Sequence, residues 1–525
     1  MPTSLLAGGF FAKAHRQKRR TESLHDPLAK TAVEPSLSGP IVLAERKAGS
    51  ANRKTKGERC AKLVRYAQPA QRRRTLVPNI ARSTERTHAA PSAPKERTRM
   101  TNLAISPTNK SNEEFDAKLR AYARLIVEAG CALKPGQDLF VRAHIESAPL
   151  VRLVTQEAYA MGAHHVTVRF SDEAIERMHF DNCPMDVFEN VPGWLAELNN
   201  SMARNGAAVL TIDSDDPEAM SGIDPRKLIA RAQASHKACK EFYDALDFGR
   251  CVWCIVGGAS PAWARKVFPD LPEDEAVERL WEAIFTTVRL KSANADEAVA
   301  AWRAHRDSFA ERCAWLNSQR FDALHYTNAH GTDLTVGLTK KHLFNGGGDT
   351  TVDGVQFFPN MPTEEIFSTP DRMRAEGTVV SAMPLAHNGS LIDNFSLTFK
   401  DGRVVDLHAE TGEDVLRSIV ETDENSCRLG EVALVPFDSP IRNSGVLFYS
   451  TLFDENASCH LALGQGFPDC YEGGLQMSAE ELLEGGVNKS ATHVDFMIGT
   501  EDLNIDGIKA DGQRVPVFRN GNWAF

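Results

Sequence analysis

The chain has 525 residues, of which 42% are hydrophobic and 25% charged, and this composition is typical of a soluble globular protein with two or three domains. It contains no run of eighteen or more apolar residues, so we expect no transmembrane helix and no membrane partner. The net charge of −10 is unevenly spread: residues 1–99 contain 22 Lys/Arg against 7 Asp/Glu, whereas residues 100–525 contain 38 against 63. The acidic body argues against nucleic acid as a partner.

The basic N-terminal segment lacks the apolar periodicity of a folded domain. It could be a nucleic-acid-binding arm, an arginine-rich targeting peptide, a disordered tail or sequence upstream of a true start at Met100. We interpret residues 1–111 as a disordered basic extension, and a chain that starts at Met100 is expected to fold and to keep its activity. The first residues do not resemble a secretory signal, so the ten cysteines are expected to be reduced thiols in a cytoplasmic protein.

From residue 112, helical and strand patterns alternate along the chain. Helices are predicted over residues 113–129, 149–160 and 194–205, and a long helix is predicted to end near Trp315. Strands are predicted over residues 138–143, 165–170 and 207–212. The run CVWCIV at 251–256 is interpreted as a further buried strand rather than a redox or zinc motif. No phosphate-binding glycine motif follows these strands. Residues 112–318 are therefore predicted to form an α/β domain with a largely parallel sheet.

Beyond about residue 320, short strand-like runs dominate. Residues 324–328 and 334–338 predict a β-hairpin. Further strands are predicted over residues 377–382, 394–399, 404–406, 431–435, 446–449 and 494–498. Helices are predicted near residues 412–421 and 479–484, and the glycines at 346–348 are interpreted as a flexible turn. Residues 319–525 are therefore predicted to form a β-rich α+β domain, with the boundary near residue 318.

Two histidine-containing segments of this second domain are candidates for metal binding. His493 and Asp495 are two residues apart at the head of a predicted strand, so both side chains point to the same face. His460 follows Glu455 by five residues, and a short turn could bring the two together. A core histidine and a helix-capping acid would explain the second pair equally well.

Two acidic candidates could complete such a site. In an extended NMPTEE segment, Glu364 and Glu365 would point to opposite sides, so only one could face the site; a helix N-terminus is the alternative explanation for both. Glu431 opens the apolar run GEVALV, where a buried charge is costly unless it is paired. Physical chemistry alone therefore makes Glu431 the acid most in need of a functional explanation.

Five segments, NMPTEE, GEVALV, DENASCHLALG, THVDFMIG and FRNGNWAF, closely resemble the metallo-aminopeptidases called aminopeptidase T and aminopeptidase S. The resemblance covers roughly residues 112–525, with the motifs in the family's order. It implies a cytoplasmic homodimer of two-domain chains, whose active sites face an internal cavity. It also implies two divalent metal ions per site, which can be zinc, cobalt or magnesium, and peptide substrates with a free N-terminus. The mixed histidine and carboxylate ligands would suit manganese as well.

Carried over by position, the resemblance assigns a set of site residues. The expected metal ligands are Glu365, Glu431, His460, His493 and Asp495, with Glu455 as a further acidic candidate. Glu365 and Glu431 are also expected to take part in catalysis, with Glu431 between the metals. The glutamate that transfers the proton could be Glu365, Glu431 or Glu455. The family has a tyrosine seven residues after the first histidine, whereas this chain has Phe467. Tyr471, four residues on, could supply a hydroxyl instead.

The function predicted from the sequence is a metal-dependent aminopeptidase, a hydrolase that releases N-terminal amino acids from peptides by means of a water activated by two metals. Two alternatives remain open. One is another metal-dependent peptidase or amidase on the same scaffold. The other is a non-catalytic metal-binding dimer, which the phenylalanine at position 467 keeps open.

Overall fold

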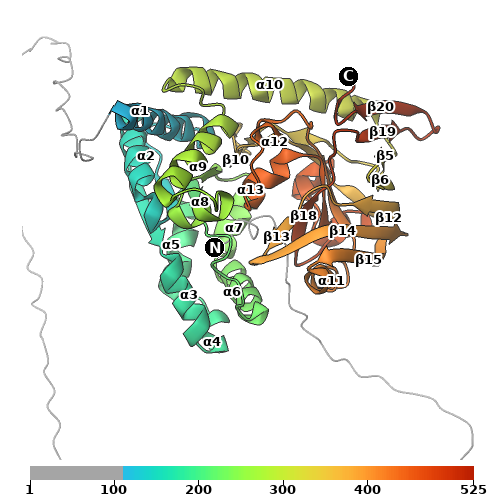
Figure 1. The fold of residues 1–525 in the computed structure, drawn as a ribbon, viewed down its shortest axis with the longest axis horizontal. Coiled ribbons are helices and arrows are strands. Elements are labelled where there is room, and N and C mark those ends of the chain that lie inside the picture. Colours follow the sequence, from blue (N-terminus) through green and yellow to red (C-terminus); the bar gives the residue numbers. More distant parts are fainter. Residues whose placement is uncertain (1–109) are drawn as a thin grey trace, which may run out of the picture. The chain divides into compact units, whose positions relative to one another are not determined.

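The computed structural model describes residues 110–525 (Figure 1). The predicted basic extension therefore lies outside the described residues, except that its last two residues already belong to the first helix. In the described part of the chain, no helix combines the length and the apolar character needed to cross a membrane.

The first half of the described chain is built on a parallel sheet with the strand order β2-β1-β3-β4-β10. These strands are β1 (Leu139–His144), β2 (Val166–Ser171), β3 (Ala208–Asp213), β4 (Trp253–Gly257) and β10 (Asn360–Met361). The central strands are buried almost throughout, as expected for parallel strands covered by helices on both faces. Both cysteines of the CVWC run are buried free thiols, and the run enters β4, so its interpretation as a buried strand is confirmed.

Ten helices accompany this sheet among the described residues. They are α1 (Lys110–Leu125), α2 (Ala148–Ala160), α3 (Glu173–Asn182), α4 (Met185–Phe188), α5 (Gly193–Arg204), α6 (Pro225–Ala238), α7 (Lys240–Asp247), α8 (Pro261–Val267), α9 (Glu273–Thr287) and α10 (Ala295–Gln319). Helix α10 contacts both α1 and β7, and in Figure 1 it runs past both halves of the fold. It ends four residues beyond the predicted end of the long helix.

The second half is rich in strands, as the sequence predicts. These strands pair mostly antiparallel and form two larger sheets. One has the order β18-β17-β16-β11-β7, formed by β7 (Asn345–Gly346), β11 (Ile366–Ser368), β16 (Leu429–Leu434), β17 (His460–Gly464) and β18 (His493–Met497). The other has the order β13-β14-β12-β6-β5-β19-β20-β21, with β15 beside β14. Its strands are β5 (Ala323–Thr327), β6 (Asp333–Leu338), β12 (Pro370–Val380), β13 (Leu385–His387), β14 (Ser390–Lys400), β15 (Arg403–Thr411), β19 (Asn504–Ile508), β20 (Arg514–Arg519) and β21 (Asn522–Trp523).

Four short helices and a small hairpin complete this half. They are α11 (Glu413–Val420), α12 (Pro440–Asn443), α13 (Thr451–Asp454), α14 (Ala479–Glu484) and the hairpin of β8 (Asp349–Thr350) with β9 (Gln356–Phe357). The apolar faces of the two larger sheets share one core, which also includes Phe309 and Leu316 of α10.

Two segments of the second half return to the core of the first. Met361 of β10 packs there, and so do Phe448 and Phe453 from the stretch around α13. The chain changes from helices to antiparallel strands near residue 318, but these two later segments pack in the core of the first half. The domain boundary at this position therefore stays a prediction.

The strand predicted over residues 446–449 is wrong. The amide of Phe448 donates to Asp454 Oδ1 at 2.8 Å, and its carbonyl accepts from Trp263 Nε1 at 2.5 Å. Tyr449 has a left-handed backbone with φ of 55°. Side chains therefore satisfy the backbone groups that a neighbouring strand would otherwise pair, and the apolar residues fill the core from a loop.

Candidate metal centre

Three neighbouring strands place the predicted ligands on one face of a sheet. Glu431 lies on β16, His460 opens β17, and His493 and Asp495 lie on β18. In the antiparallel register, Glu431 and Asp495 both lie opposite Ala462. Because alternate residues of a strand share a face, this register aligns the side chains in one row across the sheet.

Glu365 joins this row from the residue before β11, which pairs with β16. Gly346 does not lie in the flexible turn predicted from the sequence. It belongs to strand β7 and pairs with Ile366 of β11. A Cβ on Gly346 would lie only 2.3 Å from the carbonyl oxygen of Glu365. Glycine is therefore required where β7 passes the backbone of this candidate ligand.

The side chains form two groups that share Glu431. Glu365, Glu431 and His460 offer ligand atoms within 4.8 Å of one another, and so do Glu431, His493 and Asp495. His493 Nε2 lies 3.1 Å from both Glu431 Oε2 and Asp495 Oδ1, and His460 Nε2 lies 3.2 Å from Glu365 Oε2. A carboxylate common to two groups is the arrangement that a bridging ligand between two metal ions requires.

The other nitrogen of each imidazole is held by the backbone. His493 Nδ1 donates to the Gln465 carbonyl at 2.7 Å, and His460 Nδ1 donates to the Ser458 carbonyl at 3.3 Å. A carbonyl accepts only from an N–H, so in the neutral ring the lone pair is on Nε2, the atom that faces the carboxylates. Metal-ligating histidines are commonly oriented by this kind of hydrogen bond.

Electrostatics also indicate that this cluster needs positive charge. Burial, followed by the charges of Asp495 and Glu365, raises the pKa of Glu431 to about 7, although His493 acts against this rise. Burial alone would lower the pKa of His460, but the carboxylates beside it raise its pKa to about 10. Without a metal, protons on the imidazoles supply the missing charge. The chemistry of the donor set, imidazole with carboxylate, fits zinc, cobalt or manganese.

Glu455 lies at the edge of the cluster and belongs to neither group of three. It opens a 3₁₀ turn after α13, and burial followed by the charges of Glu365 and Asp495 raises its pKa well above the ordinary value. Its place beside the cluster leaves it a candidate for ligation and for proton transfer.

Glu364 and Glu365 point in opposite directions, as the alternation argument predicts. Glu364 is 4% exposed and pairs with Arg289, with Nη1–Oε1 at 2.6 Å and Nη2–Oε2 at 2.8 Å. Its backbone amide donates to Asn456 Oδ1 at 2.7 Å. Asn456 was not a candidate in the sequence, because an asparagine after an acidic pair has no distinctive spacing. It positions the turn that contains both glutamates.

We expect Glu364→Gln to reduce stability more than turnover. The substitution leaves the largely buried guanidinium of Arg289 without its countercharge, whereas Glu364 belongs to neither group of ligands. The free energy of unfolding should fall by about 2–4 kcal/mol. This is less than for complete removal of one partner of a buried ion pair, because a glutamine can keep one hydrogen bond. Thermal unfolding and steady-state kinetics measure the two effects. Glu365→Gln is the matched control with the opposite pattern; a Glu364→Gln protein that is stable but inactive would contradict this assignment.

Phe467 lies beside the cluster, whereas Tyr471 does not. The Phe467 ring centroid is 4.9 Å from that of His493 and 5.4 Å from that of Phe367. Tyr471 packs with Leu482 and Val487 in a separate apolar cluster. Its hydroxyl lies against Gly485, where an added Cβ would be 2.8 Å away. The suggestion that Tyr471 supplies a hydroxyl near the metals is therefore not supported by its position.

The chain is similar to known proteins over most of its described part. The family model described as thermophilic metalloprotease (M29) matches residues 115–523. Aminopeptidase AmpS of Bacillus subtilis (strain 168) is 47% identical over 79% of this chain and 100% of its own length. Aminopeptidase 2 of Geobacillus stearothermophilus is 44% identical over 78% of this chain and 98% of its own length. The solved structure of wild-type AmpT from Thermus thermophilus is 42% identical, with a TM-score of 0.73, and the match covers 78% of this chain and 100% of that one.

Proposed function

Because the chain belongs to the thermophilic metalloprotease family (M29) and is thus a metallo-aminopeptidase, we propose that it removes amino acids from the free N-termini of peptides at a centre of two divalent metal ions. The ligands in this proposal are Glu365, Glu431, His460, His493 and Asp495. The observation that best supports it is the shared carboxylate of Glu431 between two groups whose imidazoles both direct Nε2 inward.

When bound, the metal ions would lower the pKa of a water molecule towards about 7 and offset negative charge on the scissile carbonyl oxygen. The residues of the chain then have separate tasks. Glu431 holds the spacing between the two groups of ligands. The backbone carbonyls of Gln465 and Ser458 keep the two imidazoles in the tautomer that can ligate.

Glu455 is the group we assign to proton transfer. In its ionised form, which bound metal ions would favour, its place beside the ligands would allow it to take a proton from the attacking water and to deliver it to the leaving amine. The surplus of carboxylates around the site also favours the cationic α-amino group of a substrate over a blocked N-terminus. Exopeptidase specificity follows from that preference.

A substrate panel combined with metal analysis tests this function. The purified protein is assayed on aminoacyl-anilides, dipeptides, longer peptides and the same peptides with an acetylated N-terminus, while its metal content is measured. We expect cleavage of the free peptides one residue at a time from the N-terminus, no cleavage of the acetylated ones, and two ions at the centre. Cleavage of blocked peptides would favour a different peptidase or amidase. Bound metal without any turnover would favour the non-catalytic dimer. Dimerisation, cytoplasmic location and the choice among the metals stay predictions.

Phe467→Tyr is expected to raise kcat with unchanged metal content. The ring already lies against His493, and a hydroxyl there would add a hydrogen-bond donor where negative charge develops. Such a donor contributes up to about 10²–10³ in kcat when it acts only in the transition state. We nevertheless expect the wild-type chain to be active, because the matched acids and histidines are all present. A wild-type protein that binds metal and cleaves nothing, while Phe467→Tyr cleaves readily, would contradict this expectation.

A further inference from the structure

A second group of potential metal ligands lies at one edge of the parallel sheet, on residues that sequence analysis did not single out. His144 is the last residue of β1, Asp213 is the last residue of β3, and Asp215 follows two residues later. Strand β1 has β2 on one side and β3 on the other, so the chain reverses its direction of winding between β1 and β3. In open α/β sheets, ligands bind in the crevice at the carboxyl ends of the strands at this switch point.

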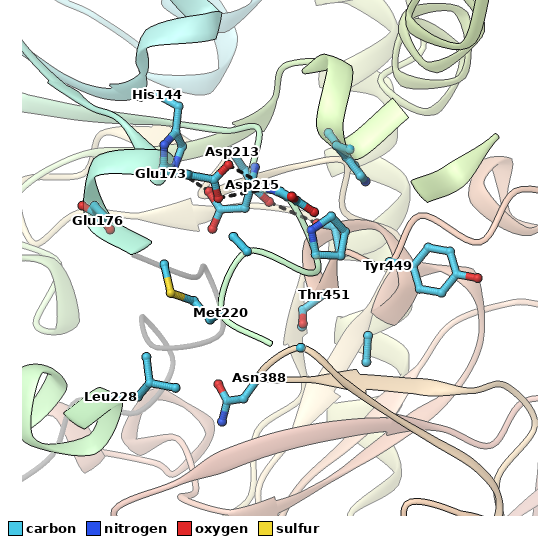
Figure 2. A pocket seen from close by; sticks show the side chains of 17 residues that line it. His144, Glu173, Glu176, Asp213, Asp215, Met220, Leu228, Asn388, Tyr449 and Thr451 are labelled. Atoms are coloured by element: carbon cyan, nitrogen blue, oxygen red, sulfur yellow. Dashed lines mark hydrogen bonds and ion pairs between the residues drawn. The ribbon is translucent and has the colours of Figure 1, made fainter. Parts of the chain in front are cut away.

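Three side chains converge in this crevice (Figure 2). His144 Nε2 lies 2.6 Å from Asp215 Oδ1, and Glu173, the first residue of α3, brings its carboxylate into the same group, with all three ligand atoms within 4.8 Å of one another. His144 is 5% exposed, and Ser171 Oγ lies 3.4 Å from its Nδ1. Ser171 thus contacts the imidazole at Nδ1, and Nε2 faces the carboxylate of Asp215.

The adjoining cavity has an unbalanced charge. Its lining includes five carboxyl groups, and no lysine or arginine is among the described residues that line it; the five are Glu173, Glu176, Asp213, Asp215 and Asp216. Glu176 is compensated by Arg231 at 3.1 Å, and Asp213 accepts from Ser450 Oγ at 3.1 Å. Burial and the neighbouring charge of Asp215 raise the pKa of Glu173 to about 7. A cation would remove the repulsion between Glu173 and Asp215. Arg142 and Arg169 line a second cavity, which shares His144, Glu176, Asp213 and Asp215 with this one.

We propose that His144, Glu173 and Asp215 form a binding site for one divalent transition-metal ion, separate from the centre around Glu431. One imidazole with two carboxylates suits manganese, cobalt or zinc better than calcium, which prefers oxygen ligands alone. Asp215, with 25% of its side chain exposed against 6% for His144, provides the route of entry.

The position of this site indicates a structural role. The same cavity is also lined by Asn388 and Gly389, between β13 and β14, and by Ser450 and Thr451 at the start of α13. An ion bound to the three ligands would neutralise the crevice at the point where the parallel sheet contacts these later segments. Metal binding should therefore stabilise the chain in addition to whatever the centre around Glu431 contributes. The inference does not depend on the proposed function.

The test uses the full-length chain with His460→Ala and His493→Ala, which removes both imidazoles of the other centre, and Co²⁺ alone as the probe. Equilibrium dialysis counts bound Co²⁺, and visible absorption reports its ligand field. We expect one Co²⁺ per chain in this background. Adding Asp215→Asn or Glu173→Gln should weaken binding at least tenfold, while adding Glu176→Gln, on the same helix but paired with Arg231, should leave binding unchanged.

Thermal unfolding confirms that each variant is folded, and the two ligand substitutions serve as alternatives if one of them is not. A folded background variant that binds no Co²⁺ would overturn the proposal and leave an ordinary His144–Asp215 ion pair. The proposal would also be overturned if neither Asp215→Asn nor Glu173→Gln changed the binding of Co²⁺, since the bound ion would then lie elsewhere.

Discussion

Glu431→Gln is expected to abolish nearly all turnover, with a fall in kcat of at least ~10³-fold. Glu431 is the only residue common to both ligand groups, and a neutral amide cannot give an anionic oxygen to each of them. Glutamine has nearly the same shape, so the sheet around it should stay intact. Steady-state kinetics on an aminoacyl-anilide, with metal content measured on the same sample, give the result.

The stability of this variant provides an independent check. Burial raises the pKa of Glu431 to about 7, which means that its ionised form is unfavourable in the metal-free native state. Glu431→Gln should therefore leave the melting temperature of the metal-free protein unchanged or higher while activity is lost, as is usual where a site is strained for function. Glu364→Gln is the control, because it should lower stability with a smaller effect on turnover. Near-normal kcat for Glu431→Gln would exclude Glu431 from the site.

Removal of metal is expected to abolish activity and to destabilise the chain increasingly as the pH rises. A chelator should eliminate turnover, and cobalt, zinc or manganese should restore it. Without metal, the cluster depends on protons. The pKa of Glu431 in the folded chain, about 7, is above its ordinary value of 4.5, so the native state binds more protons than the unfolded state between these two pH values.

The same sign holds for the histidine. The pKa of His460 is raised from 6.5 to about 10, so its stabilising contribution is complete below pH 6.5 and is lost as the pH rises towards 10. Both groups therefore make the free energy of unfolding of the metal-free chain fall as the pH rises from about 4.5 to 10. Metal binds the deprotonated ligands and removes this dependence. The difference in melting temperature between metal-loaded and metal-free protein should grow from pH 5 to pH 9. A constant difference, or full activity after chelation, would rule out this account of the centre.

Local strand geometry was enough to single out part of the candidate site, whereas the full set of ligands came from the resemblance to the family. His493 and Asp495 share a face by alternation, and the buried charge of Glu431 opens a run of apolar residues, so each needed only its immediate neighbours to be noticed. The direction of Glu364 followed from the same alternation. Its partner Arg289 did not, because the two residues are 75 positions apart and no local pattern connects them.

Other features depended on tertiary contacts that the sequence does not display. The apolar run around Phe448 has the pattern of a strand, but Trp263 and Asp454 satisfy its backbone from elsewhere in the chain. The group of His144, Glu173 and Asp215 was missed for a similar reason, since its members lie at or after the ends of three different strands. A signal was present: the acidic run after the predicted strand at 207–212 lies where the carboxyl end of a parallel strand meets its neighbours.

The two-residue strand β10 limits where the chain can be cut into fragments that fold on their own. It adds to the edge of the parallel sheet beside β4, and only two residues separate it from Glu364 and Glu365. The helical half thus anchors the chain immediately before a candidate ligand of the strand-rich half. A cut near residue 318 would leave the later fragment with an unanchored ligand and an exposed Met361. The two halves therefore cannot be exchanged between relatives as independent modules unless the segment around β10 is transferred together with the sheet that holds it.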